Sequence, residues 1–173
     1  MITLITGGSK CGKSSLAEQI MDHYNGSKIY IATMQPFGQD AYEAIERHRI
    51  MRKNKHYKTI EKYTNIHEIE LDKNCSVLLE CVGNLCANEM FAGNEIYFPS
   101  DKIVNEIRAI SESASNLVIV TNQVGSDGID YSQGTNHYIR ELGTINSQLA
   151  IISDNVIESI YGIPIVLKGE IPC

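Results

Sequence analysis

Long apolar runs, paired cysteines and a surplus of basic residues are all missing from this sequence of 173 residues. No stretch approaches the roughly 18 apolar residues of a membrane-spanning helix. The opening residues carry no basic segment and run straight into glycines, which predicts that there is no signal peptide. We therefore expect a cytoplasmic protein without a membrane span.

Five cysteines, an odd number, form no pattern of a disulfide framework or a zinc site. They occur without a C-x-x-C pair, at Cys11, Cys75, Cys81, Cys86 and Cys173. Disulfide-stapled domains and structural zinc sites are built on paired, closely spaced cysteines. Cys75 and Cys81 flank an apolar run, so we expect both to be buried, reduced thiols.

Acidic residues outnumber basic ones by 21 to 15, for a net charge of −6. Proteins that coat nucleic acids need a basic surface, so we expect no nucleic-acid partner. Binding of a free nucleotide is still open, because it takes only a few local charges. The 43% of hydrophobic residues can build a sizeable core, which excludes disordered and coiled-coil classes, and the length fits one domain, 1–173.

Strand-like and helix-like segments alternate along the chain. Apolar runs and extended patterns predict strands at 2–6, 28–32, 57–61, 77–80, 117–121, 155–161 and 163–168. Helical spacing predicts helices at 14–24, 40–52, 100–111 and 135–152, the third with Ser100 as its N-cap. The last two strands form a pair around Gly162. This order predicts an α/β fold with a mostly parallel sheet flanked by helices and a C-terminal strand pair.

A glycine-rich segment between the first strand and the first helix satisfies G-x-x-x-x-G-K-[ST], the phosphate-binding loop. It reads Gly7-Gly8-Ser9-Lys10-Cys11-Gly12-Lys13-Ser14. Glycines let the backbone turn its N–H groups toward phosphate oxygens, and the following helix adds its positive N-terminal end. We expect Lys13 to reach the terminal phosphates and the Ser14 hydroxyl to hold Mg²⁺. The fold is therefore predicted to be of the P-loop NTPase type.

A phosphate loop also needs a carboxylate at the end of a neighbouring strand, where it holds the metal and its water shell. Glu80 closes the apolar run Val77-Leu-Leu and is the best candidate. A strand-end acid that simply faces water is the alternative. Asp154 is a weaker candidate, because it precedes its strand rather than ending it.

A basic run stands out in this acidic chain, Arg47-His48-Arg49-Ile50-Met51-Arg52-Lys53. On a helix, His48 and Arg52 share a face with Ile45, and the long side chain of Arg49 can swing toward it. Two interpretations stay open, a solvated helix face or a patch that faces a triphosphate. Neighbouring arginines favour a neutral, nucleophilic imidazole at His48. We expect the other histidines at the surface: His23, His56, His67 and His137.

Together these residues resemble a known family, the bifunctional adenosylcobinamide kinase / adenosylcobinamide-phosphate guanylyltransferase of cobalamin biosynthesis. The segment Thr6–Ser14 is similar to that family's phosphate loop, and Ile45–Arg52 resembles its segment with the guanylylated histidine. The remaining motifs keep the family's order: Tyr30-Ile-Ala-Thr33, Thr59-Ile-Glu61, Leu78-Leu-Glu-Cys-Val82, Thr121-Asn-Gln-Val-Gly125, Gly143-x-x-Asn146 and Gly162-Ile-Pro-Ile-Val-Leu-Lys168. The likeness spans nearly the whole chain.

The resemblance implies two reactions, with Lys13 and His48 as catalytic residues. The hydroxyl of adenosylcobinamide is first phosphorylated by a nucleoside triphosphate, ATP or GTP. GMP then passes from GTP, through His48, to give adenosylcobinamide-GDP. The resemblance also implies a homo-oligomer, a trimer. The phosphate loop and the strand end after it predict Mg²⁺ held by Ser14 and Glu80. The implied nucleotide contacts are the phosphate loop (Gly7, Gly8, Ser9, Lys10, Cys11, Gly12, Lys13, Ser14), the end of the second strand (Ala32, Thr33, Met34) and Arg49, Arg52, Glu61 and Glu80.

The sequence departs from the family pattern late in the chain. Gln123 stands where the family usually has glutamate, and Gly125-Ser-Asp-Gly-Ile-Asp130 lacks the usual proline. Ile139 and Arg140 fall in a replaced Phe-Arg-Asp motif, and Ser147 replaces a glutamine. We expect these changes to concern the corrinoid or a subunit contact. Two other functions stay open: a P-loop kinase of another small hydroxylated substrate, and a non-catalytic GTP-binding module.

Overall fold

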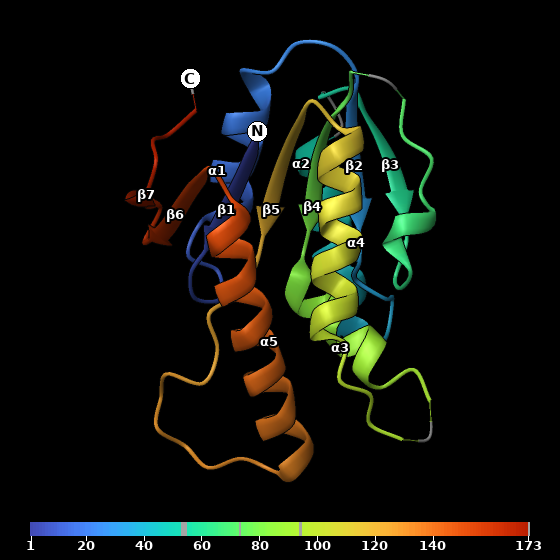
Figure 1. Ribbon diagram of the computed structural model, residues 1–173, viewed down its shortest axis with the longest axis vertical. Coiled ribbons are helices and arrows are strands. Elements are labelled where there is room, and N and C mark those ends of the chain that lie inside the picture. Colours follow the sequence, from blue (N-terminus) through green and yellow to red (C-terminus); the bar gives the residue numbers. More distant parts are fainter. Residues whose placement is uncertain (53–54, 73, 94, 173) are drawn as a thin grey trace.

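The computed structural model describes residues 1–52, 55–72, 74–93 and 95–172, without the side chains of residues 40, 41, 44, 48, 51 and 52. Its strands are β1 (Ile2–Thr6), β2 (Lys28–Ala32), β3 (Tyr57–Glu61), β4 (Ser76–Glu80), β5 (Asn116–Val120), β6 (Asn155–Ile160) and β7 (Ile163–Lys168). Its helices are α1 (Lys13–Asp22), α2 (Gln39–Arg52), α3 (Val82–Met90), α4 (Ser100–Ser113) and α5 (Gln133–Ile152), with a 3-10 turn η1 (Ile66–Glu68). Strands and helices alternate (Figure 1), as the apolar runs predict.

The strands form one seven-stranded sheet in the order β3-β2-β4-β5-β1-β6-β7. β1 lies between β5 and β6 and is parallel to both, with Ile2 opposite Leu117 and Thr3 opposite Asn155. Only the last pair, β6 and β7, is antiparallel. The mostly parallel sheet and its C-terminal strand pair are therefore confirmed.

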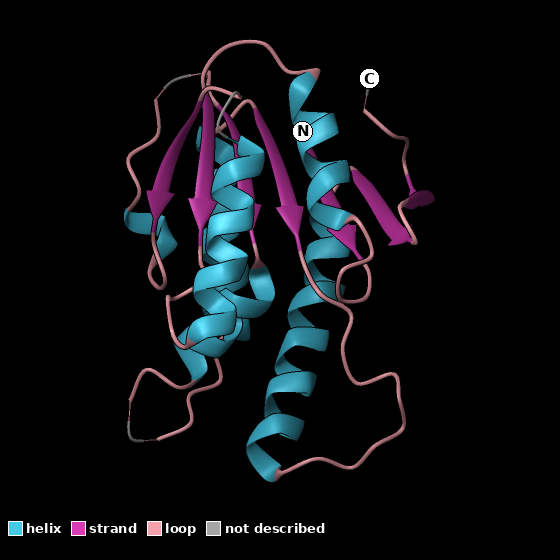
Figure 2. Ribbon diagram, turned by 180° about the vertical axis from the view of Figure 1, so that it is seen from behind, coloured by secondary structure: helices cyan, strands magenta, loops and turns pink. Residues whose placement is uncertain are grey.

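Apolar side chains cover both faces of the sheet, which is why the central strands are continuously hydrophobic. On one face α1 packs Leu16, Ile20 and Met21 against residues of the sheet such as Val118. On the other face α3, α4 and α5 bury a larger cluster that includes Leu79. Figures 1 and 2 show these two helix layers from opposite sides. No helix within the described part of the chain is long and apolar enough to cross a membrane.

Two helix ends differ from the expectation. Ser100 is the first residue of α4 rather than its N-cap, and its N–H donates to the Glu141 carboxylate of α5, 3.0 Å away. A carboxylate from a packed neighbour thus replaces the expected hydroxyl cap. Helix α5 begins at Gln133, because the Ser132 hydroxyl accepts from the Thr135 N–H and caps it there. Helix α3 follows β4 without having been predicted.

The cysteines on either side of β4 are buried thiols, as expected. Cys75 is fully buried and Cys81 is 7% exposed, and the described cysteines Cys11, Cys75, Cys81 and Cys86 are all free. Burial raises the pKa of Cys81 to about 11 and that of Cys86 to about 12. Both buried thiols are therefore protonated at neutral pH and poor nucleophiles.

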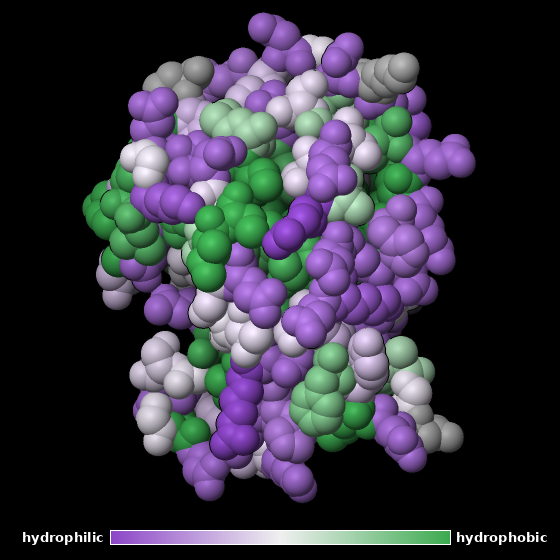
Figure 3. Space-filling view, viewed as in Figure 1, coloured by the Kyte–Doolittle hydropathy of each residue, from purple (hydrophilic) through white to green (hydrophobic). Residues whose placement is uncertain are grey.

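The edge strand β7 presents apolar side chains to solvent. Ile163 is 62% exposed and Leu167 is 59% exposed, with Ile165 and Val166 also exposed between them. Figure 3 shows hydrophobic atoms gathered over β6 and β7, at the left edge of the view. The carboxyl ends of the parallel strands all lie at one end of the sheet. The loops that follow them there form the site described next.

Candidate active site

The phosphate loop connects the carboxyl end of β1 to α1 and is shaped by glycine. Gly12 has a φ of 98°, and a Cβ there would lie 3.0 Å from the Cα of Gly162, so only glycine fits. The Lys13 side chain is 7% exposed, and its ammonium donates to the Gly8 carbonyl, 2.5 Å away. The loop therefore holds a buried cation beside the backbone that the motif turns toward phosphate.

Ser14 and Glu80 meet at the start of α1. The Ser14 hydroxyl donates to Glu80 Oε1, and the Tyr30 hydroxyl donates to Glu80 Oε2, 3.0 Å away. Glu80 is 9% exposed and closes β4, next to β2. A hydroxyl and a carboxylate are oxygen ligands of the kind that Mg²⁺ prefers, usually alongside substrate phosphates. The pair therefore fits a magnesium ion held by Ser14 and Glu80.

Asp154, the weaker carboxylate candidate, lies at the opposite edge of the sheet. It precedes β6, and its Oδ2 accepts the Ile2 N–H, 2.7 Å away, at the amino end of β1. Since the phosphate loop follows the carboxyl end of β1, Asp154 faces away from it. Glu80 is the carboxylate that the fold brings to the loop.

Basic residues of α2 and an acid of β3 form another wall of the site. Arg49 Nη2 lies 2.9 Å from Glu61 Oε1, and the Tyr63 hydroxyl donates to the other Glu61 oxygen at 3.2 Å. The hydrogen bond from Arg49 lowers the pKa of Glu61, and the same bond raises the pKa of Arg49. Both groups are therefore charged at neutral pH, one positive and one negative.

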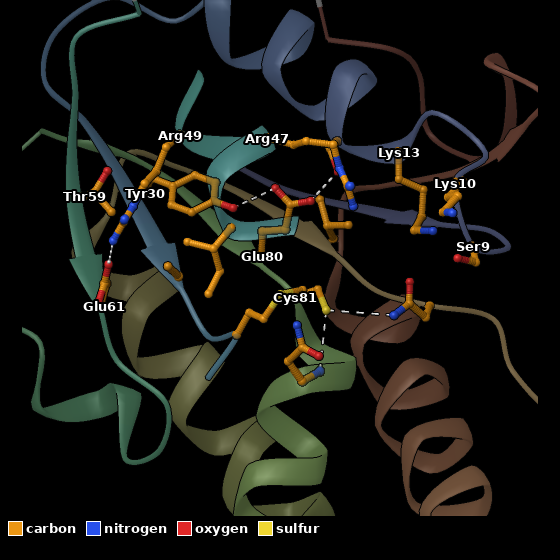
Figure 4. A pocket seen from close by; sticks show the side chains of 17 residues that line it. Ser9, Lys10, Lys13, Tyr30, Arg47, Arg49, Thr59, Glu61, Glu80 and Cys81 are labelled. Atoms are coloured by element: carbon orange, nitrogen blue, oxygen red, sulfur yellow. Dashed lines mark hydrogen bonds and ion pairs between the residues drawn. The ribbon is translucent and has the colours of Figure 1, made fainter. Parts of the chain in front are cut away.

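A cavity of about 400 Å³ joins these parts. Figure 4 shows its lining side chains converging from the phosphate loop, β2, α2, β3 and the ends of β4 and β5. Of the expected nucleotide-binding residues, the cavity is lined by Ser9, Lys10, Lys13, Ser14, Ala32, Met34, Arg49, Glu61 and Glu80. The side chains of His48 and Arg52 lie outside the described part of the structure.

Thr33 occupies a different place from the one expected of a nucleotide contact. It is fully buried, its hydroxyl donates to the Cys81 carbonyl at 2.8 Å, and the Cys81 N–H donates back to it at 2.8 Å. Asn88 of α3 then donates to the carbonyls of Thr33 (2.7 Å) and Tyr63 (3.0 Å). These bonds connect the loops after β2 and β3 to α3. The Thr33 hydroxyl therefore holds the loops of the site together from within the protein instead of facing the cavity.

The cavity also contains residues that the sequence did not single out as nucleotide contacts. They are Tyr30, Ile45, Thr59, Cys81, Asn84, Val120 and Asn122, and Arg47 lines the cavity as part of the basic run that was expected either in solvent or facing a triphosphate. Asn84 and Asn122 come just after β4 and β5, where parallel strands of α/β proteins present ligand-binding groups, and this position was a usable signal. Tyr30 gave no signal beyond its place in the family motif Tyr30-Ile-Ala-Thr33, because within an apolar strand it has the pattern of a core residue. The expectation of surface histidines fails at His137, which is half-buried and packs on the Phe98 ring, 5.4 Å between centroids.

Solved structures share this fold at low sequence identity. An ATPase from the type III secretion system of pathogenic bacteria superposes with a TM-score of 0.61 at 13% identity. The match covers 95% of this chain and 56% of that one. A Pyrococcus horikoshii protein, PH0250, gives a TM-score of 0.57 at 9% identity, covering 97% of this chain and 86% of that one. These likenesses show the fold alone, a mostly parallel sheet flanked by helices.

Sequence comparisons give closer relatives. The "Bifunctional adenosylcobalamin biosynthesis protein CobU" of Escherichia coli K12 is 30% identical over 97% of this chain and its own full length. The protein of that name from Salmonella typhimurium is 27% identical over the same shares, and CobP of Pseudomonas aeruginosa is 24% identical over 98% of this chain and 99% of its own. The family model "Cobinamide kinase / cobinamide phosphate guanyltransferase" matches residues 3–167. The chain therefore belongs to the cobinamide kinase / cobinamide phosphate guanyltransferase family.

Proposed function

We propose that this enzyme phosphorylates the hydroxyl of adenosylcobinamide and then transfers GMP from GTP to the resulting phosphate. One observation carries the proposal: a single cavity contains both the phosphate-loop residues Lys13 and Ser14 and the α2 arginines Arg47 and Arg49. Phosphoryl transfer asks mainly for positioning and charge stabilisation, which these groups supply. Family membership supplies the substrate class.

In the kinase step, Lys13 would stabilise charge on the transferred phosphoryl group. Ser14 and Glu80 would hold magnesium, which would supply positive charge to neutralise the phosphates. The loop N–H groups and the start of α1 would orient the phosphate chain toward the substrate hydroxyl. ATP and GTP have the same triphosphate group, so we propose both as nucleotides that bind at the site.

In the guanylyl step, His48 is proposed as the nucleophile. Its imidazole nitrogen forms a bond to the α-phosphorus of GTP, and the bond to pyrophosphate breaks. The phosphate oxygen of adenosylcobinamide phosphate then attacks the same phosphorus, and the imidazole leaves. The support is the position of His48 in α2, between Arg47 and Arg49, which line the cavity. Their positive charges would face the triphosphate.

Multiple-turnover assays test this proposal directly. Wild-type protein with adenosylcobinamide, Mg²⁺ and ATP alone is expected to accumulate the phosphate ester. Adding GTP is expected to convert it to adenosylcobinamide-GDP with release of pyrophosphate. Phosphorylation of another small alcohol but not of adenosylcobinamide would favour a different P-loop kinase. Binding of GTP without any turnover would favour a non-catalytic module.

Glu80→Gln is expected to raise the Mg²⁺ concentration needed for half-maximal kinase rate by about tenfold, because the carboxylate loses its charge. Glu89→Gln is the matched control, since Glu89 is also buried, at 7% exposed. Its carboxylate accepts hydrogen bonds from the Asn65 N–H and the Lys102 ammonium and does not line the cavity. A Mg²⁺ titration of the initial rate measures the effect. Equal Mg²⁺ requirements in wild type and Glu80→Gln would contradict the metal role.

The homo-trimer implied by the family resemblance is also part of the proposal. Sedimentation equilibrium of the full chain measures it, and a monomer at micromolar concentration would contradict it.

A further inference from the structure

The turn between β6 and β7 is seated directly against the phosphate loop. The Cys11 carbonyl accepts two hydrogen bonds here, one from the Ser159 hydroxyl near the end of β6 and one from the Gly162 N–H of the turn, each 2.8 Å long. Ser159 is 1% exposed, so water does not compete for its bond. In Figures 1 and 2 the loop after β1 lies beside the end of β6. Segments far apart in the sequence therefore meet at one carbonyl.

Two glycines of the loop are in the same contact. A Cβ at Gly7 would lie 2.6 Å from the Ser159 carbonyl oxygen, and a Cβ at Gly12 would lie 3.0 Å from the Cα of Gly162. Backbone on both sides lines this contact, so neither partner can give way as a flexible side chain would. The hairpin is thus as close to the loop as glycine permits.

The hairpin turn itself has a fixed shape. Tyr161 has a φ of 51° and Gly162 a φ of 81°, the pair of positive values found in tight two-residue turns that match the twist of antiparallel strands. With β6 held in the sheet by β1, this turn aims the Gly162 N–H at the loop. The donor is therefore placed by the fold and not by the loop's own sequence.

We propose that Ser159 and Gly162 are positioning residues that fix the direction of the Cys11–Gly12 peptide. This peptide is trans, so its carbonyl and its N–H point in opposite directions. Two donors hold the carbonyl toward the hairpin, and the Gly12 N–H consequently points away from it, as a phosphate-binding loop requires. A flipped peptide would present a carbonyl oxygen to phosphate instead. The inference rests on the proposed function only in that the loop binds a nucleotide.

Ser159→Ala tests the proposal against Ser153→Ala. Ser153 is equally buried at 1% exposed, and its hydroxyl also donates to a backbone carbonyl, that of Leu149 at 2.7 Å. Both variants are expected to lower the melting temperature to a similar extent. Only Ser159→Ala is expected to weaken binding of Mg²⁺ and the fluorescent nucleotide mant-GDP, by about fivefold, the usual effect of one hydrogen bond. Unchanged binding in Ser159→Ala, or equal weakening in both variants, would overturn the proposal.

Amide hydrogen exchange on the wild-type protein tests the same geometry without a variant. The Gly162 amide is expected to be protected with or without nucleotide, and the Gly12 amide to become protected when Mg²⁺ and GDP are added. A Gly12 amide that still exchanges rapidly in the complex would refute the assigned peptide direction. Failure of the wild-type enzyme to phosphorylate adenosylcobinamide would count against the proposed function alone, since these measurements follow nucleotide binding only.

Discussion

Lys13→Ala is expected to lower the rate of adenosylcobinamide phosphorylation by about a hundredfold or more. The buried ammonium lies beside the Gly8 carbonyl at the loop and is the charge nearest to where the terminal phosphates would bind. Alanine removes that charge at the point where the transition state needs it. Because Lys13 and the α2 arginines line one cavity, we expect guanylyl transfer to fall as well. Initial rates at saturating Mg²⁺ and nucleotide measure both effects.

Lys28→Ala is the control for the loss of a lysine. Lys28 begins β2 at the amino edge of the sheet, where its ammonium lies 3.9 Å from Asp22. We expect near wild-type turnover from this variant. Near-normal kinase turnover in Lys13→Ala would instead contradict the role of the loop in phosphoryl transfer.

His48→Ala is expected to abolish guanylyl transfer while leaving much of the kinase activity. Wild-type protein incubated with GTP labelled at the α-phosphate should carry covalent label through a phosphorus–nitrogen bond, and His48→Ala should carry none. Such a bond hydrolyses in acid and survives alkali, so label should be lost at low pH and kept at high pH. Scintillation counting of denatured protein measures it.

The labelling rate should also depend on pH. An ordinary imidazole titrates near pH 6.5, and only its neutral form is a nucleophile. Labelling is therefore expected to decline below about pH 6. A rate that is flat from pH 5 to pH 8 would point to a nucleophile other than histidine.

His23→Ala is the matched control, because His23 is exposed at the end of α1. The His23→Ala protein should carry as much label from GTP as the wild type. If His48 only contacts phosphates electrostatically, His48→Ala will bind GTP more weakly and still be labelled at another residue. Undiminished acid-labile label on His48→Ala would therefore refute the assignment of His48 as the nucleophile.

The parts of the site that the sequence could predict are those encoded by contiguous residues. The phosphate loop is such a motif, since its glycines, Lys13 and Ser14 all lie within residues 7–14. The apolar run before Glu80 likewise predicted both the strand and the carboxylate at its end, which the fold brings to Ser14. Local pattern and local geometry coincide in these two cases.

The rest of the site depends on contacts that no local pattern encodes. Helix α3 was missed because Gly83 weakens its helical pattern, while its N-terminus is capped by the Cys81 sulfur, an unusual acceptor for the Asn84 N–H. Thr33 follows a strand as a ligand-binding residue would, yet its hydroxyl bonds to the backbone of Cys81 in the neighbouring strand's loop. Whether Thr33 contacts a ligand or bonds to the Cys81 backbone can be decided only when β2 and β4 are known to be adjacent in the sheet.

The central place of β1 has a consequence for how this protein is made. β1 leaves the ribosome well before both of its neighbours in the sheet, because β5 and β6 come late in the chain. At translation rates of roughly 5–20 residues per second, the wait until β6 is complete lasts about 8 to 30 seconds. Pairings between distant segments also slow folding in general. We therefore expect a stalled nascent chain that has released β1 to β5, but not β6 and β7, to be unable to retain nucleotide.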